Sequence, residues 1–403
     1  MRIQRLNTSA AELHEIDQNY SRYNQKHNIF IRLFWDEEIK RLEHARQKNA
    51  EQYSKDNKPG YSKFDKAFLA GTMNFMREKI VQNIHICDQE FNAWNGEKGT
   101  KEEGMDTFTL TKAIKKAAKM YGACAVGIAP LDRRWVYSHW YDLQTRQSYP
   151  IQFSDEAPEY NRIQEPTLLE NKARVIPASM KTAIVMLFEM DPGCLKYSPT
   201  LLPYANGRFV YSEMCLTTNS LAGLIRELGY NAIPSVNCTA LNIPLAIDAG
   251  LGQIGRNGKL INPYLGTRIR IAKVITDLPL DCDQPIDFGV NEFCEACRKC
   301  ARKCPAGAIP SDSKVCSGMD ELSNNGYLRW AIDHKKCFCY WSECGTNCNI
   351  CITVCSYNRG YKWTKSILNS SKESSTLVDN LLDSLDDCGP DVFDPEASFW
   401  LNS

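Results

Sequence analysis

The sequence lacks both a long apolar run and an excess of charge of either sign. Ala183–Phe188 is typical of its apolar runs, whereas a helix that spans a bilayer needs about 20 apolar residues. Lysine plus arginine number 48, and aspartate plus glutamate also number 48. A balanced charge provides no electrostatic attraction to nucleic acid or to an anionic membrane surface. We therefore expect no membrane span and no nucleic-acid partner.

The N-terminal stretch also lacks an export leader. Met1–Asn7 contains neither an apolar segment nor a twin arginine, which are the marks of export signals. We expect either a cytoplasmic protein, if this is the full native chain, or a mature chain from which a leader was removed. The 403 residues, 43% of them hydrophobic and 24% charged, suffice for two or three ordinary soluble domains.

Cysteine, by contrast, is abundant, and its spacing decides the class of chemistry. The run from Cys294 to Pro305 follows C-x2-C-x2-C-x3-C-P, which binds three thiolates to one [4Fe–4S] cluster and gives the fourth to a neighbouring cluster. Disulfides do not favour such tight triplets, and a zinc site uses four ligands per metal without the Cys-Pro ending. A second cysteine set follows between Cys337 and Cys355. The spacing therefore predicts two adjacent clusters that transfer single electrons.

The ferredoxin pattern exchanges one cysteine between the two sets. The first cluster is then predicted to bind Cys294, Cys297, Cys300 and Cys355. The second takes Cys304, Cys348, Cys351 and one further ligand, for which Cys337, Cys339 and Cys344 compete. The scattered cysteines are expected to be small buried apolar residues: Cys87, Cys124, Cys194, Cys215, Cys238, Cys282 and Cys388.

Hydrophobic periodicity divides the chain into four parts. Residues 1–105 carry a helical stretch at Asp65–Val81 and no recognisable chemistry. From 106 to 290, helices alternate with strands, which predicts an α/β layered core. Its segment at about 129–180 is rich in proline and aromatic residues and is interpreted as a loop-like insertion. The cysteine-rich part covers 291–360, and the serine-rich, acidic part from 361 to 403 is expected to be a helical or wrapping tail.

A glycine string lies between the core and the cysteine sets. Gly250, Gly252 and Gly255 imitate the G-x-G-x-x-G dinucleotide fingerprint. The context differs, because Ile243–Leu245 is a poor lead-in strand and Arg256–Gly258 is typical of a turn rather than a helix start. We therefore favour a loop whose backbone approaches some other large cofactor.

The glycine string, the cysteine sets and several unrelated blocks together resemble one family, the cobamide-dependent reductive dehalogenases of the respiratory type. The matching blocks are 122–130, 211–214, 228–237, 244–258, 268–273 and 276–280, followed by both cysteine sets. The resemblance covers about residues 106–360. It implies a nitroreductase-like α/β core that binds a cobamide, followed by a ferredoxin-like domain with two [4Fe–4S] clusters.

The resemblance also assigns residues. It makes Cys337 the last cluster ligand, because the family places that cysteine just before an aromatic-Trp pair, here Tyr340-Trp341. It implies cobamide contacts from the glycine string and its neighbours, and no histidine on cobalt. These predicted contacts are Gly250, Gly252, Gly255, Arg256, Asn257 and Trp341. Ser356 replaces the usual proline after Cys355 and leaves the ligand count intact.

Reductive dehalogenation replaces carbon–halogen by carbon–hydrogen and consumes two electrons and one proton. By resemblance, Tyr211 is the proton donor, with Arg270 beside it and Asn237 lining the same pocket. A phenol is a weak acid, and an adjacent guanidinium stabilises its phenolate. Arg268 and Arg270 share one strand face, so the sequence alone does not choose between them. Lys273 is expected to be an ordinary solvated residue or a cofactor contact.

The resemblance further implies a small halogenated organic substrate, a low-potential electron donor and a small membrane-anchor subunit, and it is compatible with a homodimer. It would place a leader-trimmed chain at the outer face of the cytoplasmic membrane. The nearest rival is epoxyqueuosine reductase, a tRNA-modifying enzyme. Against it stand Tyr211 where an acidic donor is expected, the long N-terminal part, and the absence of basic excess. Two further hypotheses are a non-catalytic two-cluster electron carrier and a cobamide-trafficking protein.

Overall fold

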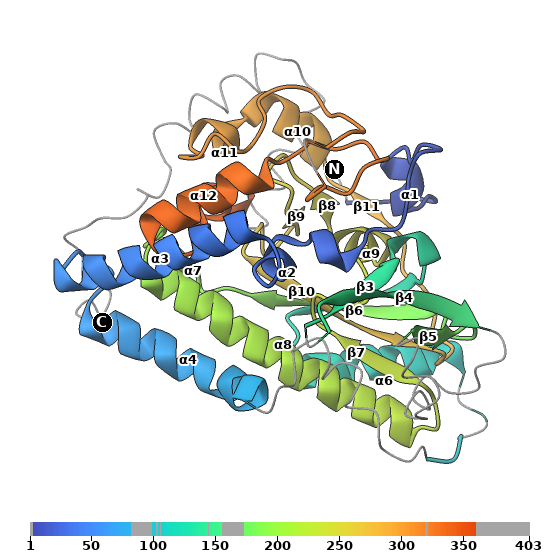
Figure 1. The fold of residues 1–403 in the computed structure, drawn as a ribbon. Helices are drawn as coiled ribbons and strands as arrows, with labels where there is room; N and C mark the ends of the chain where they lie inside the picture. Colours follow the sequence, from blue (N-terminus) through green and yellow to red (C-terminus); the bar gives the residue numbers. More distant parts are fainter. Residues whose placement is uncertain are drawn as a thin grey trace.

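The computed structural model describes residues 3–81, 99–101, 104, 106–143, 145–154, 173–318 and 321–359. At its centre lies a four-stranded sheet in the order β2–β6–β10–β7 (Figure 1). Each neighbouring pair is antiparallel. The strands are β2 (Ala125–Pro130), β6 (Thr182–Glu189), β7 (Ala232–Ser235) and β10 (Ile269–Thr276).

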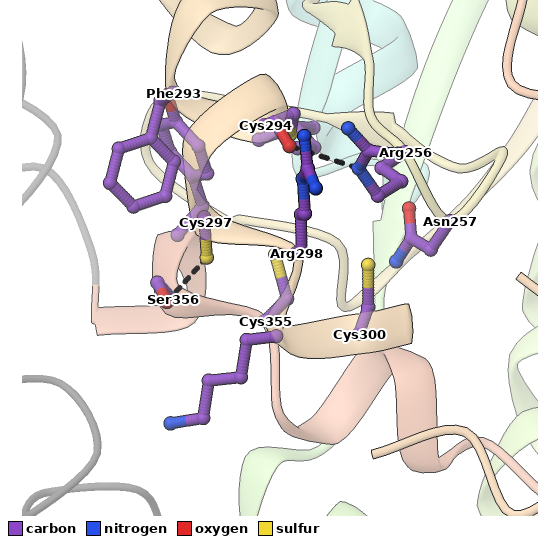
Figure 2. Close-up of a pocket in the computed structure, with 12 residues that line it drawn as sticks. Arg256, Asn257, Phe293, Cys294, Cys297, Arg298, Cys300, Cys355 and Ser356 are labelled. Atoms are coloured by element: carbon purple, nitrogen blue, oxygen red, sulfur yellow. Dashed lines mark hydrogen bonds between the residues drawn. The ribbon is translucent and has the colours of Figure 1, made fainter. Parts of the chain in front are cut away.

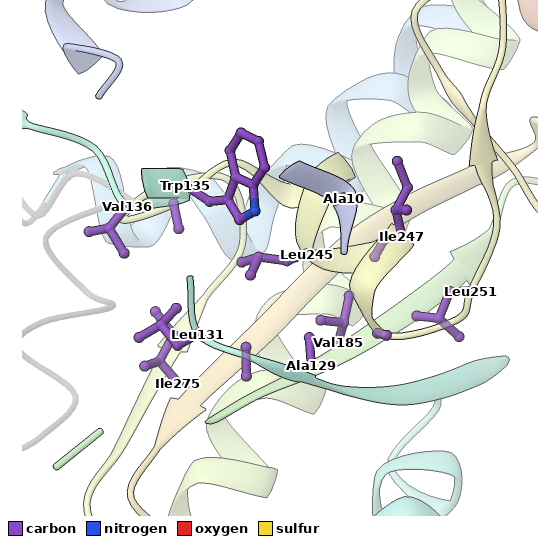
Figure 3. Close-up of a cluster of buried hydrophobic side chains, with 14 of the residues drawn as sticks. Ala10, Ala129, Leu131, Trp135, Val136, Val185, Leu245, Ile247, Leu251 and Ile275 are labelled. Carbon is purple, nitrogen blue, oxygen red and sulfur yellow. The ribbon is translucent and has the colours of Figure 1, made fainter. Parts of the chain in front are cut away.

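The central sheet is buried on both faces. Ile184 and Met186 of β6 face a cluster that includes Val210 and Met214 of α8 (Leu201–Glu227). Val185 and Leu187 face the opposite cluster, drawn in part in Figure 3, which includes side chains of α9 (Asn242–Asp248). A strand covered on both faces needs apolar residues at every position. This explains why the apolar run at 183–188 lacks alternation.

Helix α6 (Thr107–Met120) packs on the α8 side of the sheet. Its N-cap Asp106 accepts a hydrogen bond from the Thr109 amide, which satisfies a free helix-end donor. Gly122 follows its end at φ +122°, a conformation that favours glycine. Helix α6 and strands β2, β6 and β10 therefore confirm the alternation of helices and strands that the sequence predicts from 106 to 290. Between β6 and α8 lies α7 (Pro192–Leu195).

The insertion at about 129–180 is not loop-like in its described residues, so this prediction was wrong. It begins with η2 (Arg133–Trp135) and forms a three-stranded sheet. The strands are β3 (His139–Asp142), β4 (Gln147–Ser154) and β5 (Arg174–Pro177). Aromatic residues such as Trp140 and Tyr149 favour strands, and their rings pack together across β3 and β4 at 5.4 Å.

The N-terminal segments extend over the rest of the molecule. Strand β1 (Gln4–Arg5) pairs with β11 (Ile286–Asp287). Helix α1 (Ala10–Leu13) packs on α9, α3 (Glu37–Lys55) on α12, and α4 (Lys63–Val81) runs along α8 (Figure 1). The predicted helix at 65–81 is thus confirmed. Two short elements, η1 (Gln25–His27) and α2 (Ile29–Arg32), connect α1 to α3.

The cysteine-rich segment carries short helices joined by irregular chain and lies at the top of the view in Figure 1. These helices are α10 (Val290–Cys297), α11 (Lys299–Arg302), α12 (His334–Cys344), α13 (Ile350–Thr353) and η4 (Ser356–Arg359). The short strands β8 (Gln253–Ile254) and β9 (Leu260–Ile261) lead toward it. The predicted tail at 361–403, Cys87 and Cys388 lie outside the described residues. None of the described helices is long and apolar enough to cross a bilayer.

Candidate functional site

The first predicted ligand set meets in one pocket. Helices α10 and α11 and the turn after α13 bring together Cys294, Cys297, Cys300 and Cys355. Arg298 separates α10 from α11 at φ +46°, and this break lets the chain turn between the second and third cysteines. Figure 2 shows the sulfur atoms of Cys297, Cys300 and Cys355 around the same space. The grouping predicted from spacing therefore exists in the fold.

Burial dominates the electrostatics of this pocket. It raises the pKa of the Cys355 thiol to about 12, and neighbouring thiols act in the same direction. It also raises the pKa values of Cys294 and Cys300 well above the ordinary range. Thiolates in such surroundings need a cationic partner, which iron supplies. The donor set therefore fits an iron–sulfur cluster.

Within the described residues, no three His, Cys, Asp or Glu side chains could hold a single metal ion. A cubane differs from a single ion, because each of its four cysteines binds a different iron atom.

The second set gathers around Cys337. Burial raises the pKa of this thiol to about 12, and the nearby Cys351 and Cys304 thiols add to the effect. Burial raises the pKa of Cys348 too, and the Cys351, Cys344 and Cys337 thiols reinforce it. The Ala308 amide donates to the Cys304 sulfur at 3.4 Å. The structure thus places Cys337 with the other three predicted ligands.

Of the two competing cysteines, Cys339 has other surroundings: Lys335 and Glu38, rather than a member of the set, are its strongest charged neighbours. Cys344 lies near the second set, because its thiol adds to the raised pKa values of Cys337 and Cys348. Its own thiol donates to the Thr346 carbonyl at 3.2 Å.

Of the scattered cysteines, Cys194 and Cys215 are buried and free as predicted. Cys238 is buried too, but it is disulfide-bonded rather than a simple apolar residue. Cys124 and Cys282 are exposed, so their predicted burial was wrong; Cys124 lies just before β2, outside the sheet.

Arg256 and Asn257 connect the core to both cysteine sets through hydrogen bonds. Arg256 is 1% exposed. Its Nε donates to the Cys294 carbonyl at 3.0 Å, and its Nη1 donates to the carbonyls of Pro310 and Asp312. Asn257 Nδ2 donates to the Cys351 carbonyl at 3.1 Å. The predicted cobamide contact of these side chains stays a prediction, and the bonds described serve the protein itself.

The glycine string is explained by close packing. A Cβ at Gly250 would lie 2.5 Å from the Gln284 carbonyl oxygen, and one at Gly252 would lie 2.1 Å from the Ile261 carbonyl oxygen. At Gly255 it would lie 2.6 Å from Ile261 Cδ1. The stretch before the string is helix α9 rather than a strand, and a turn follows it. A dinucleotide fingerprint therefore lacks its structural context.

Tyr211, Asn237 and Arg270 meet at one end of the central sheet. Tyr211 projects from α8, Asn237 follows β7, and Arg270 lies on β10. Asn237 Nδ2 donates to the Tyr211 hydroxyl oxygen at 2.8 Å, and the Arg270 guanidinium carbon lies 5.2 Å from the Tyr211 ring centroid. Asn237 is exposed and Tyr211 is half-buried, so the group is open to a ligand.

Arg268 and Arg270, which share one strand face, have different partners. Arg268 pairs with Glu189 at 2.8 Å and donates to the Asn358 carbonyl at 2.6 Å. Arg270 is the one that reaches Tyr211. Trp341 lies beside the second cysteine set, where its ring is 5.9 Å from that of Phe30.

Sequence reasoning missed three residues around this group. A Cβ at Gly207, one helical turn before Tyr211, would lie 3.1 Å from Arg270 Nη2, so glycine leaves room for the guanidinium. Asn242 Nδ2 approaches Asn237 Oδ1 at 3.2 Å. Lys273 is fully buried and donates to Asn242 Oδ1 at 2.7 Å, so its expected solvation was wrong. The i, i+4 spacing of Gly207 and Tyr211 was the one available signal.

Comparison with known proteins gives a consistent result, although no family model matches. A tetrachloroethene reductive dehalogenase of Sulfurospirillum multivorans is 34% identical over 318 residues, 74% of this chain and 62% of the relative. One from Desulfitobacterium hafniense is 36% identical over 315 residues, 74% of this chain and 55% of the relative. The chain thus spans less than two thirds of the length of these relatives. An epoxyqueuosine reductase of Lactococcus garvieae is 30% identical over 135 residues, 32% of this chain and 36% of the relative.

A solved structure shares the fold. It belongs to a reductive dehalogenase whose structure suggests a mechanism for B12-dependent dehalogenation. The similarity has a TM-score of 0.69 at 21% identity and covers 96% of this chain and 48% of that one. Over the matched 74% of its length, the chain belongs to the reductive dehalogenase family.

Proposed function

We propose that the protein replaces the carbon–halogen bond of a small organohalide by carbon–hydrogen. The observation that carries this proposal is the meeting of Tyr211, Asn237 and Arg270 at an open end of the core. A positioned acid near the cysteine-rich segment suits a reaction in which two electrons and one proton enter and a halide leaves. Family membership supports the same reaction.

The architecture fits this proposal. The four-stranded sheet with helices on both faces would be a nitroreductase-like core, and the segment from α10 to η4 a ferredoxin-like domain with two [4Fe–4S] clusters. Within the described residues, Ser212 Oγ and Arg270 Nε are buried without a hydrogen-bond partner. Both flank Tyr211, and the amide groups of a corrinoid are suitable partners for them. The residues present therefore fit a cobamide at this end of the core.

When bound, the corrinoid supplies the cobalt that cleaves the carbon–halogen bond, and the clusters supply its electrons. The protein's own task is the proton. Tyr211 holds it on the phenol oxygen, and Asn237 donates a hydrogen bond to that oxygen. Arg270 stabilises the phenolate that remains after transfer, because its positive charge lies beside the ring. The buried Arg256 keeps the first cysteine set fixed against the core.

Halide release tests the proposal. Protein with clusters and corrinoid, supplied with a reduced viologen and a panel of halocarbons, is expected to release halide with the dehalogenated product. Tyr211→Phe is expected to lower kcat by about 10²-fold to 10⁴-fold, the usual contribution of a positioned acid. Tyr121→Phe is the matched control, because this tyrosine is exposed at the end of α6, and it should keep full activity. No halide from any halocarbon, or an unaffected Tyr211→Phe, would contradict the proposal.

Specific observations argue against two other functions. An epoxyqueuosine reductase would act on tRNA, but the chain has no basic excess, and the match to such an enzyme covers 32% of its length. A plain electron carrier needs the cysteine sets alone and gives no reason for a tyrosine, an asparagine and an arginine to meet elsewhere.

The family resemblance also supports a low-potential electron donor, a small membrane-anchor subunit and a place at the outer face of the cytoplasmic membrane, and a homodimer is compatible with it. Fractionation of cells, with the protein followed by antibody, tests the location: recovery in the cytoplasmic fraction alone would contradict it.

A further inference from the structure

A chain of hydrogen bonds leads from a buried lysine to the phenol of Tyr211. Lys273 Nζ donates to Asn242 Oδ1 at 2.7 Å and to the Cys238 carbonyl at 3.0 Å. Asn242 Nδ2 approaches Asn237 Oδ1 at 3.2 Å, and Asn237 Nδ2 donates to the Tyr211 oxygen at 2.8 Å. The four side chains come from β10, α9, the loop after β7, and α8.

The orientation of the Asn242 carboxamide is fixed from both of its ends. An ammonium group donates hydrogen bonds and cannot accept them, so the oxygen of Asn242 must face Lys273. On the other end, the carbonyl oxygens of Val236 and Ile271 each lie 2.8 Å from Asn242 Nδ2. Carbonyl oxygens only accept, so the nitrogen of Asn242 must face them. Both constraints select the same one of the two carboxamide orientations.

The orientation of the Asn242 carboxamide fixes that of Asn237. Asn242 turns its NH₂ group toward Asn237, and two facing NH₂ groups would repel each other. The Asn237 oxygen therefore faces Asn242, even though the two hydrogens of Asn242 serve three acceptors. The Asn237 NH₂ group is then left to face the phenol. If the Asn237 carboxamide were reversed, its oxygen would accept a hydrogen bond from the Tyr211 phenol. The phenolic proton would then not be directed at a substrate.

We propose that Asn242, anchored by Lys273, is a positioning residue that makes Tyr211 a proton donor. By fixing the Asn237 carboxamide, it keeps the phenol oxygen as an acceptor and leaves the phenolic hydrogen directed at the substrate. A hydrogen bond donated to the phenol oxygen also stabilises the phenolate that forms when the proton leaves. This inference rests on the proposed function of Tyr211 and extends it to two residues on the opposite side of the sheet.

The placement of Lys273 suits this role. Arg270 and Lys273 stand on β10 three positions apart, so they lie on opposite faces of the sheet. Lys273 is fully buried and is paired in register with Ser235 of β7. A buried ammonium is costly unless it is hydrogen-bonded, so its bond to Asn242 is held strongly. The Lys273 ammonium thereby fixes the carboxamide orientations that reach Tyr211, although Lys273 itself lies on the other face of the sheet.

The test compares Asn242→Ala and Lys273→Met with Asn231→Ala. Asn231 is the control, because it is a buried asparagine outside the chain of hydrogen bonds, with Nδ2 bonded to Asp277 at 2.7 Å, whereas Asn242 is half-buried. Holoprotein with oxidised clusters and cobalt(III) is labelled with ¹³Cζ-tyrosine, and the Tyr211 resonance is assigned by its loss in Tyr211→Phe. We expect Asn242→Ala to shift the Tyr211 resonance, because the phenol oxygen loses the donor that Asn242 holds in place, and Lys273→Met to shift it in the same direction. Asn231→Ala should leave it unchanged.

The kinetic readout is the split between kcat and KM. We expect kcat of Asn242→Ala to fall by up to about tenfold, as the loss of one well-placed hydrogen bond allows, while KM and corrinoid content stay the same. A shift of the tyrosine resonance without any halide release by the wild type would overturn the proposed function and keep the inferred link. An active wild type whose Asn242→Ala variant keeps both its tyrosine resonance and its kcat would overturn the inference and keep the function.

Discussion

Cys339 lies two residues from Cys337 and carries the same thiol, yet the two side chains have different environments. Cys337 is surrounded by thiols of the second set, whereas Cys339 faces Lys335 and Glu38. The spacing of the cysteines left this choice open, because a shift of two residues on a helix has no consequence until neighbouring segments are placed. The same holds for Arg268 and Arg270, which share a strand face and differ only in what α8 and Glu189 bring to them.

Cysteine substitution tests the ligand set. Cys337→Ser is expected to lower the iron content of anaerobically prepared protein by up to about four atoms, the content of one cluster. Cys339→Ser is the matched control and should retain full iron, as should Cys344→Ser. Iron analysis with electron paramagnetic resonance of the reduced protein measures both. Loss of a cluster from Cys339→Ser with an intact Cys337→Ser would reverse the assignment.

At the scale of elements, local sequence signals predicted the helices and strands whose environment follows from their own residues. Strand β6 is uniformly apolar because it is buried on both faces, and α6 has its Asp106 cap and its Gly122 end. The insertion was misread, because its proline and aromatic residues suggested a loop, whereas the aromatic residues pair across β3 and β4 once these strands are brought together. The meeting of α8 with β10 at Gly207 depends on long-range packing, and no local pattern predicts it.

Helix α8 offers a paired test of this meeting. Gly207→Ala should raise helix stability by up to about 1 kcal/mol through propensity alone. The added Cβ, however, presses on Arg270 Nη2 from 3.1 Å and shifts the guanidinium from Tyr211. We expect an unchanged or higher melting temperature together with a several-fold lower kcat.

Gly223→Ala lies on the same helix, and its Cβ would have nothing within 4 Å. It should gain the same stability at full activity. Equal activities of the two variants would contradict this prediction, because they would show that a Cβ at position 207 does not displace Arg270.

At the scale of the whole molecule, the N-terminal segments connect the core with the cysteine-rich part. Strand β1 pairs with β11, and Ala10 donates to Asp248 of α9. His14 closes the same region, where its Nδ1 lies 3.3 Å from the Leu328 carbonyl and its ring meets Tyr327 edge-on at 5.6 Å. Burial lowers the pKa of His14 to about 4, so acid must charge a side chain that the fold keeps neutral.

This depressed pKa predicts a pH-dependent stability. The stabilisation is fully present above about pH 6.5, the pKa of an unperturbed histidine, and is lost as the pH falls toward 4. Between pH 7.5 and 5.5, the wild type should lose about 1 kcal/mol more free energy of unfolding than His14→Asn. His44→Asn, on the exposed side of α3, is the control and should follow the wild type. Parallel curves for wild type and His14→Asn in denaturant unfolding would refute this explanation.

The proposed reductive dehalogenation would require a corrinoid and two clusters, and metal analysis of anaerobically prepared and reconstituted protein measures both cofactors at once. We predict about eight iron atoms and one cobalt per chain, together with a corrinoid absorbance spectrum. Eight iron atoms without any bound corrinoid, even after reconstitution, would contradict the proposed function and leave a two-cluster electron carrier.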